Sequence, residues 1–414
     1  MAMTTRRLSI IIYLVGSVLL LGACGTAQSV ATTPIAFTPI APARPIDTAL
    51  PPAPPWRVAS QPITTDNAPQ LGLLGRLSAP GTPSTIFAHA LSPDSTRLAT
   101  LDQSYLVNWE LVTGEPLFSI TRRDEAQVYY APDKTELYTV AQSGALYVFD
   151  AETGEQRTAL SAPAEFNNVM TYQPTAGLLA LGATTGDVSI VDVLARATVT
   201  VAAGEAVGVL ALAFSPDGER LAVTYTNGTI RVWDWRAGMV VAQPRIPPAE
   251  RRLQFDQLRF SNDGTILVGV ETNVGAGWDA VAGNLLYTLP IDEGGGAYGV
   301  KIAPTGNYVL TLGLPKDARL WALASGAQAA TFPDYGGIEP IDAAFSPDGT
   351  MLFMAQYGGA NTLWNIAQVA QGSIFRGTTS INSKTIINTA WTDDGFLLLL
   401  FDARGPVEVW GIPE

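Results

Sequence analysis

One short motif recurs at a nearly constant interval along most of this chain, and this repetition is the strongest constraint on its fold. The stretch 213–235 contains a Ser-Pro-Asp-Gly turn and ends in a Trp-Asp-Trp sequence, and Pro216 of the turn precedes Trp233 by 17 residues. The turn positions recur every 39 to 46 residues, so the chain contains eight copies of one supersecondary unit. The other seven pairs, with separations of 16 or 17 residues, are Pro93/Trp109, Pro132/Phe149, Pro174/Val191, Asn262/Trp278, Pro304/Trp321, Pro347/Trp364 and Asp393/Trp410.

Each unit has the pattern of four short antiparallel strands. In the fourth unit, apolar residues alternate along a first strand, and the Ser-Pro-Asp-Gly turn follows, where Pro presets one backbone angle and Gly accepts a positive φ. Second and third strands are expected at 220–225 and 229–234, and a further Gly turn leads to a fourth, as at 284–290 in the next unit. This repetition predicts an all-β fold, an eight-bladed β-propeller with four-stranded antiparallel blades.

The last unit is too short for a fourth strand, because only four residues follow Trp410. A matching segment lies at the other end of the repeats, where 73–77 has the apolar pattern of 285–289. We therefore expect residues 71–77 to complete the eighth blade, so that an N-terminal strand joins the C-terminal blade and closes the ring. Closure of this kind removes an exposed sheet edge.

These repeats resemble the WD40-type propellers over residues 71–414, most closely at 209–244 and 341–366. The Trp-Asp dipeptide stands at 233–234 and 278–279, and related pairs end most other units. The resemblance implies a platform for binding other proteins. The chain also resembles eight-bladed quinoprotein-like propellers, one of which is an envelope lipoprotein that assists outer-membrane protein assembly. The docking Trp of those repeats does not follow the Thr-Gly pairs at 113–114 and 153–154, so we expect no quinone cofactor.

The N-terminus has the three parts of a secretory signal. Arg6 and Arg7 precede an uncharged apolar run at 8–21, and Leu21-Gly22-Ala23-Cys24 follows directly and resembles the lipobox of bacterial lipoproteins. That resemblance implies removal of residues 1–23 as a signal peptide and acylation of Cys24, and several acyl chains anchor a protein stably to a membrane. An uncleaved transmembrane helix is the alternative, since the apolar run extends to Ala27. Both alternatives place the rest of the chain outside the cytoplasm.

We expect residues 24–70 to form a flexible tether, and residues 71–414 to form the propeller. Ten prolines occur between residues 26 and 69, with many Thr and Ala and few charges, and such a segment cannot bury enough apolar surface to fold alone. Trp56 is the large aromatic residue of this Pro-rich run, and we expect it to rest on the propeller surface or remain solvated.

The composition argues against several classes of function. The net charge is −13, whereas a nucleic-acid-binding protein usually has a basic surface, so we expect no nucleic-acid partner. One Cys and one His leave no disulfide framework and no Cys/His metal cluster. No G-x-S-x-G motif accompanies His89, which lies on an expected first strand and is predicted to pack inward. We therefore expect no metal, no cofactor and no enzymatic activity.

A binding surface remains, and the variable loops suggest where it lies. In a propeller, the loops from fourth to first strands and from second to third strands lie on one face, called here the loop face; the other turns form the turn face. Because Arg and aromatic residues dominate interaction hot spots, we predict a partner-binding surface on the loop face. Its candidate residues are Arg122, Arg123, Phe166, Arg245, Arg251, Arg252, Phe255, Tyr298 and Tyr335.

We therefore interpret the chain as a membrane-anchored, extracytoplasmic lipoprotein of the cell envelope. Its propeller, expected to be a monomer, would serve as a non-catalytic scaffold for protein partners. Two alternatives remain open at this point. The central pore could bind a small molecule or a glycan, or carry lyase or lactonase activity, which would need convergent carboxylates or a metal. The protein could also be an envelope-assembly factor with a specific machinery partner.

Overall fold

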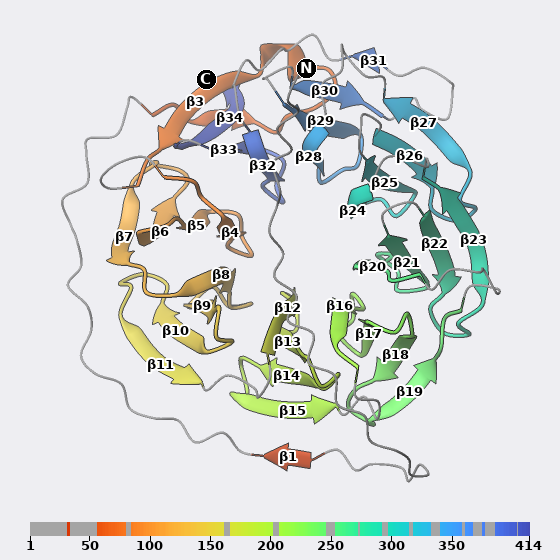
Figure 1. Ribbon diagram of the computed structural model, residues 1–414. Helices are drawn as coiled ribbons and strands as arrows, with labels where there is room; N and C mark the ends of the chain where they lie inside the picture. Colours follow the sequence, from red (N-terminus) through yellow and green to blue (C-terminus); the bar gives the residue numbers. More distant parts are fainter. Residues whose placement is uncertain are drawn as a thin grey trace, which may run out of the picture.

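Short antiparallel strands joined by tight turns form eight sheets around a central axis (Figure 1). The prediction of an all-β, eight-bladed propeller is therefore confirmed. Among the residues that this computed structural model describes, no helix is long and apolar enough to cross a membrane. The described residues are 31–33, 56–79, 84–160, 166–201, 207–245, 253–271, 274–291, 297–313, 318–332, 340–357, 361–366, 375–376, 386–403 and 405–414.

In each blade the first strand lies nearest the axis and the fourth lies at the rim (Figure 1). The strands of blades 1 to 4 are β4 (Ala88–Leu91), β5 (Arg97–Leu101), β6 (Tyr105–Glu110), β7 (Pro116–Thr121), β8 (Glu125–Tyr130), β9 (Glu136–Ala141), β10 (Leu146–Asp150), β11 (Gln156–Leu160), β12 (Phe166–Gln173), β13 (Leu178–Ala183), β14 (Val188–Asp192), β15 (Ala197–Val201), β16 (Val209–Phe214), β17 (Arg220–Tyr225), β18 (Ile230–Asp234) and β19 (Met239–Ala242).

Blades 5 to 7 repeat this order, and blade 8 has three strands from the C-terminal end of the chain. The strands of blades 5 to 8 are β20 (Gln257–Phe260), β21 (Ile266–Glu271), β22 (Val274–Asp279), β23 (Leu285–Pro290), β24 (Ala297–Ile302), β25 (Tyr308–Gly313), β26 (Ala318–Ala322), β27 (Gln328–Phe332), β28 (Pro340–Phe345), β29 (Met351–Gln356), β30 (Thr362–Asn365), β31 (Phe375–Arg376), β32 (Ile386–Trp391), β33 (Leu398–Asp402) and β34 (Val407–Pro413).

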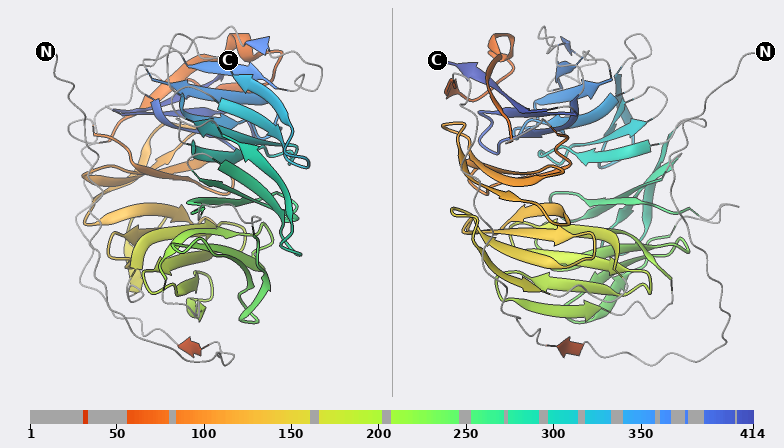
Figure 2. Two further views of the ribbon diagram at one scale, coloured as in Figure 1. Left: turned by 45° about the vertical axis from the view of Figure 1, so that its right-hand side comes forward. Right: turned by 60° about the vertical axis from the view of Figure 1, so that its left-hand side comes forward.

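The fourth strand of blade 8 comes from the N-terminal side of the repeats, as predicted. Strand β3 (Gly72–Leu77) pairs antiparallel with β34, with Gly72 opposite Gly411 and Leu77 opposite Val407. The figures show β3 beside β34, although the two are at opposite ends of the repeat region (Figures 1 and 2). The ring is thereby closed between blades 8 and 1, and this junction is called the seam below.

The hydrophobic core of the described residues lies between blades. Eight clusters of buried side chains are present, and each one is shared by two neighbouring blades. At the seam, Leu77 from β3 and Phe401 from β33 pack with Leu98 and Val107 of blade 1. A blade therefore buries its apolar faces only when both neighbours are present, which is why the eight repeats form a complete ring.

The expected boundary between tether and propeller at residue 70 is wrong. Residues 56–79 are described as one continuous stretch, and strand β2 (Ala59–Gln61) pairs with the end of β34. A single 3-10 turn, η1 (Ala68–Gln70), follows, and Ile63, Ala68 and Leu71 are buried between blades 7 and 8. Few apolar residues are enough to hold this segment because the propeller supplies the rest of the buried surface. Farther upstream, β1 (Ala31–Thr33) pairs with the outer edge of β15.

The repeated Asp residues hold the turns, as the sequence predicts. In blade 4, the Ser215 hydroxyl donates to the Asp217 carboxylate, and the Arg220 backbone N–H donates to the Ser215 Oγ at 2.9 Å. Gly218 has a φ of +71°, which an L side chain rarely adopts. The hydrogen bond from Ser215 is the main cause that lowers the pKa of Asp217. These carboxylates therefore have a structural role in the first-to-second-strand turns.

A hydrogen bond between the repeat Trp and a Thr on the second strand is present in some blades and absent from blade 4. Trp109 Nε1 donates to Thr100 Oγ1 at 2.9 Å in blade 1, and Trp321 and Thr311 form the same bond in blade 6. Blade 4 keeps Trp233 but has Val223 at the Thr position, and the buried Trp233 Nε1 has no partner among the described residues. Leaving a buried donor unpaired costs about 1–3 kcal/mol.

We predict that Val223→Thr stabilises the protein by about 1 kcal/mol, because the new hydroxyl accepts the hydrogen bond that Trp233 now lacks. Val223 is fully buried, and Thr has nearly the same shape. The midpoint of urea unfolding measures the change. Val140→Thr is the control for a buried hydroxyl, since Val140 is equally buried in β9 of blade 2, one residue after Thr139, which is the equivalent of Val223, and Phe149 stands there in place of the repeat Trp. We expect Val140→Thr to lose stability. A similar loss in Val223→Thr would contradict the interpretation.

Candidate functional site

Two of the predicted arginines lie on the loop face between blades 1 and 2, together with an aromatic residue that the sequence analysis missed. Phe87 precedes β4 and is 39% exposed. The Arg122 guanidinium lies 4.7 Å from the centre of the Phe87 ring, and Arg122 Nε donates to the Glu125 carbonyl at 2.5 Å. Arg123 is exposed, and its backbone N–H donates to the Glu125 carboxylate at 2.6 Å. The loop thus holds one arginine against an aromatic ring and leaves the side chain of the other exposed to solvent.

Phe166 lies on the same face one blade farther along. Its ring covers Gly144 in the β9–β10 turn, where a Cβ would be 2.7 Å from the ring, and the Phe166 side chain remains partly exposed. Phe87, Arg122, Arg123 and Phe166 are together called the loop-face cluster. The sequence could not single out Phe87, because its exposure depends on how the preceding loop enters β4.

Arg245 and Phe255 lie in the connection between blades 4 and 5, away from the loop-face cluster. Arg245 is exposed, and its carbonyl accepts a hydrogen bond from Trp278 Nε1 at 3.1 Å. The proposal that Phe255 contacts a partner is wrong, because this side chain is only 2% exposed. Its ring packs edge-on against Trp278 at 5.1 Å, in the space that Gly269 leaves open. Phe255 is thus a core residue that looks like a loop residue in the sequence.

The structure does not describe the side chains of the remaining predicted site residues. Cys24, Arg251, Arg252 and Tyr335 lie outside the described residues. Tyr298 is part of β24, but its side chain is not described. Their predicted roles therefore stay predictions.

The inner strands place three charged or titratable residues close to the axis. Lys301 Nζ lies 3.0 Å from Asp342 Oδ1, and Asp342 Oδ2 accepts hydrogen bonds from the Thr389 backbone N–H and hydroxyl at 2.8 and 3.0 Å. Asp342 of blade 7 thereby connects blades 6 and 8. The His89 ring stacks on Phe401 of blade 8 at 4.0 Å, in agreement with the predicted inward packing. Among the described residues, no group of three or more His, Cys, Asp or Glu could hold a metal ion.

Burial lowers the pKa of His89 from 6.5 to about 4; nearby Lys301 acts in the same direction and Asp342 in the opposite one. His89 is consequently neutral at pH 7. Its contact with Phe401 is the stacking of an uncharged ring at the seam, and burial opposes protonation of the imidazole.

We predict that His89 makes the protein less stable in mild acid. The unfolded chain binds a proton on His89 near pH 6.5, whereas the folded protein binds it only near pH 4. The free energy of unfolding therefore has its full value above about pH 6.5 and falls by up to about 3 kcal/mol as the pH drops to 4. His89→Leu removes this titration. Leucine is the natural residue at the equivalent position of blade 4, where Leu212 stands. Unfolding midpoints at pH 7 and pH 4.5 measure the effect, and an equal loss in both proteins would contradict it.

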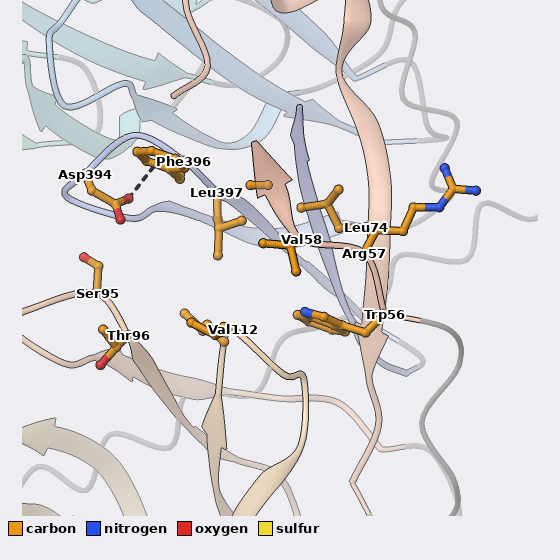
Figure 3. A pocket seen from close by; sticks show the side chains of 12 residues that line it. Trp56, Arg57, Val58, Leu74, Ser95, Thr96, Val112, Asp394, Phe396 and Leu397 are labelled. Atoms are coloured by element: carbon orange, nitrogen blue, oxygen red, sulfur yellow. Dashed lines mark hydrogen bonds between the residues drawn. The ribbon is translucent and has the colours of Figure 1, made fainter. Parts of the chain in front are cut away.

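A groove of about 130 Å³ lies on the turn face at the seam (Figure 3). The N-terminal segment forms one wall, and blades 1 and 8 form the others. Trp56, Val58, Leu74 and Val112 surround an apolar centre, whereas the Arg57 side chain points away from it (Figure 3). The complete lining is Trp56, Arg57, Val58, Ala59, Leu74, Ser95, Thr96, Leu111, Val112, Asp394, Phe396 and Leu397. The sequence predicts that Trp56 rests on the propeller surface or remains solvated, and it gives no sign of this groove, because the residues of its walls come from distant parts of the chain.

Comparison with known proteins agrees with this architecture. The WD repeat-containing protein SL1-17 of Schistosoma mansoni is 29% identical over 145 residues, which is 34% of this chain and 48% of that protein. Apoptotic protease-activating factor 1 of Danio rerio is 24% identical over 242 residues, which is 56% of this chain and 17% of that protein. The chain thus spans about half or less of the curated relatives that it matches.

Two solved structures share the fold. The C-terminal WD40 domain of Sif2 has a TM-score of 0.64 at 13% identity, with 83% of this chain and 99% of that chain covered. The computationally designed Ika8 protein has a TM-score of 0.62 at 18% identity, with 82% and 100% covered.

A family model described as the nucleolar protein 10-like N-terminal domain matches residues 84–293. This range is just over half of the chain and contains blades 1 to 5. The chain therefore belongs to the nucleolar protein 10-like, N-terminal domain family of β-propellers, and its ring is a WD40-like propeller.

Proposed function

We propose that this protein is a membrane-anchored lipoprotein outside the cytoplasm, whose propeller binds protein partners on its loop face without catalysing a reaction. The observation that carries the proposal is the loop-face cluster, in which the exposed Phe87 contacts the half-buried Arg122 next to the exposed Arg123. Aromatic and Arg side chains supply much of the binding energy in protein interfaces. A WD40-like ring is a rigid support on which such loop residues keep their positions.

The position of the N-terminal segment also supports binding of partners at the loop face. Strand β1 pairs with β15 at the rim of blade 3, and farther along the chain Trp56 borders the groove on the turn face together with Ser95, Thr96 and Asp394. The loop-face cluster lies on the opposite face. A lipid on Cys24 would attach upstream of both contacts, and neither of them uses the loop-face cluster.

The charges favour a partner segment that has acidic and aromatic residues. The chain as a whole has a net charge of −13, so its long-range field would repel an acidic partner. Arg123 nevertheless offers a local positive charge, and Phe87 a flat apolar surface. Specific recognition at this cluster therefore requires short-range contact rather than long-range steering.

The anchor and the binding face are tested together in intact cells that produce the full chain. Cys24→Ala removes the proposed acylation site, and we expect the protein to move from the membrane fraction to the soluble fraction. Ser17→Ala, within the apolar run, is the matched control and stays with the membrane. Retention of the Cys24→Ala protein in the membrane fraction would contradict the lipoprotein proposal.

A photo-crosslinking residue then reports which face binds. We place it at Ser143 on the loop face of blade 2, or at Glu155 on the turn face of the same blade, since both positions are exposed. We expect a covalent adduct with a partner protein from position 143 only, reduced at least tenfold by Arg123→Glu and Phe87→Ser together. Equal adducts from both positions, or adducts that persist in the double variant, would contradict binding at the loop-face cluster.

A further inference from the structure

At two junctions between neighbouring blades, an aromatic ring on the outer strand packs against a glycine in the next blade. Phe118 on the outer strand of blade 1 lies against Gly154 in the β10–β11 turn of blade 2, where a Cβ would be 2.6 Å from the ring. Tyr287 on the outer strand of blade 5 lies against Gly326 in blade 6 in the same way, at 2.5 Å. Each glycine has a positive φ, 72° and 67°, so the turn both needs a glycine and makes room for the ring.

At the seam, the outer strand lacks this ring. Phe118 is paired with Asn108 and Tyr287 with Gly277, each one residue before the repeat Trp. The residue at this position of β3, opposite Val409 and so one residue before Trp410, is Gly75. Strand β3 therefore has no side chain to place against Gly114, the glycine of the corresponding turn in blade 1.

Trp56 fills the place of the missing ring. A Cβ on Gly75 would lie 2.3 Å from Trp56 Cε3, and a Cβ on Gly114 would lie 2.2 Å from the same atom. The indole is thus inserted between the backbones of two blades, and it requires a glycine on both sides. Trp56 packs with the buried cluster that joins blades 8 and 1.

We infer that the seam contains a socket for an aromatic side chain presented by an extended peptide, and that residues 56–61 of this chain are its occupant. The socket is formed by Gly75, Gly114, Leu74, Leu111 and Val112. Residues 56–61, which carry Trp56, are called the latch. When the latch is docked, it completes the seam and fixes the start of the tether. When it is released, the socket is open. The inference does not depend on the lipid anchor.

Few contacts besides the indole hold the latch. The Arg57 backbone N–H donates to the Leu74 carbonyl at 3.0 Å, and β2 pairs with β34 only at Ala59 and Gln61. Ser60 Oγ donates to the Ile412 carbonyl at 3.1 Å. Residues 57, 58, 60 and 61 are exposed, in contrast with the buried Ile63. The ring of Trp56 is therefore the principal attachment of this segment.

The groove beside Trp56 gives the latch a path of release. Its volume of about 130 Å³ is empty next to the indole, so one side of the ring is not covered by protein. Release would free six residues, which can extend roughly 20 Å. The latch would thus lengthen the tether while the deeper contacts of Ile63, Ala68 and Leu71 keep the strand β3 in place.

The first test is Gly75→Phe in the full chain. The three atoms nearest to a Cβ at this position all belong to Trp56, and the backbone there tolerates a side chain, so the introduced phenyl ring should occupy the socket and expel Trp56. We expect trypsin to cleave after Arg57 at least tenfold faster than in the unaltered chain, with no loss of the β-sheet circular dichroism signal. An unchanged cleavage rate would overturn the inference.

Stability supplies the matched comparison. Trp56→Ala should lower the unfolding midpoint, and Trp56→Phe should restore most of the loss. Adding Gly75→Phe to Trp56→Ala should also restore it, because the ring then comes from β3 itself. Failure of Gly75→Phe to rescue Trp56→Ala would show that the two residues do not share one site, and would overturn the inference.

Binding in trans tests the socket directly. A fluorescent peptide with the sequence of residues 51–61 should bind the Trp56→Ala protein. It should bind the unaltered chain only weakly, because the latch already occupies the socket. The same peptide with Ala in place of Trp56 should bind neither protein. Equal binding of both peptides would overturn the assignment, and if Trp56→Ala does not fold, the cleavage rate of Gly75→Phe decides the question.

Discussion

The pairing of β3 with β34 is the interaction on which the rest of the structure depends. It joins residues more than 300 positions apart, and an ion pair between Arg76 and Glu408 at 2.9 Å accompanies it. Each blade has its apolar faces covered by two neighbours, so a ring that remained open at the seam would expose a cluster containing Leu77, Leu98 and Phe401. Closure also removes the free edge of β34, which would otherwise be able to pair with another chain.

The seam also determines how the two faces of the molecule differ. Trp56 and Val58 of the N-terminal segment border the groove on the turn face. The loop-face cluster lies on the other side of the ring, with Phe87 and Arg122 in contact. In the proposed function, the proposed binding surface and this segment would not compete for space. Near the axis, the ion pair between Lys301 and Asp342 connects blades, so these charges contribute to holding the ring together.

The repeat spacing was enough to predict the number of blades and the closing strand, because turn residues and the Trp positions are fixed by local geometry. Other features depend on contacts that spacing does not encode. Phe255 was assigned to a surface because its neighbours are polar, yet Gly269 opens a space for its ring in the core. Trp56 lies among prolines, so the sequence predicts a tether residue that rests on the propeller surface or remains solvated. Its position follows from Gly75 and Gly114, two glycines that look ordinary until the blades are assembled.

Amide hydrogen exchange in β34 tests the closed ring most directly. This strand has β33 on one side and only β3 and β2 on the other, so its protection depends on the N-terminal strands remaining paired. The account predicts that the amides of residues 407–411 exchange as slowly as those of β6, the equivalent third strand of blade 1, because both exchange only when the ring opens as a whole. Exchange in β34 many times faster than in β6 would show that β3 detaches locally, and would contradict closure of the ring as the central constraint.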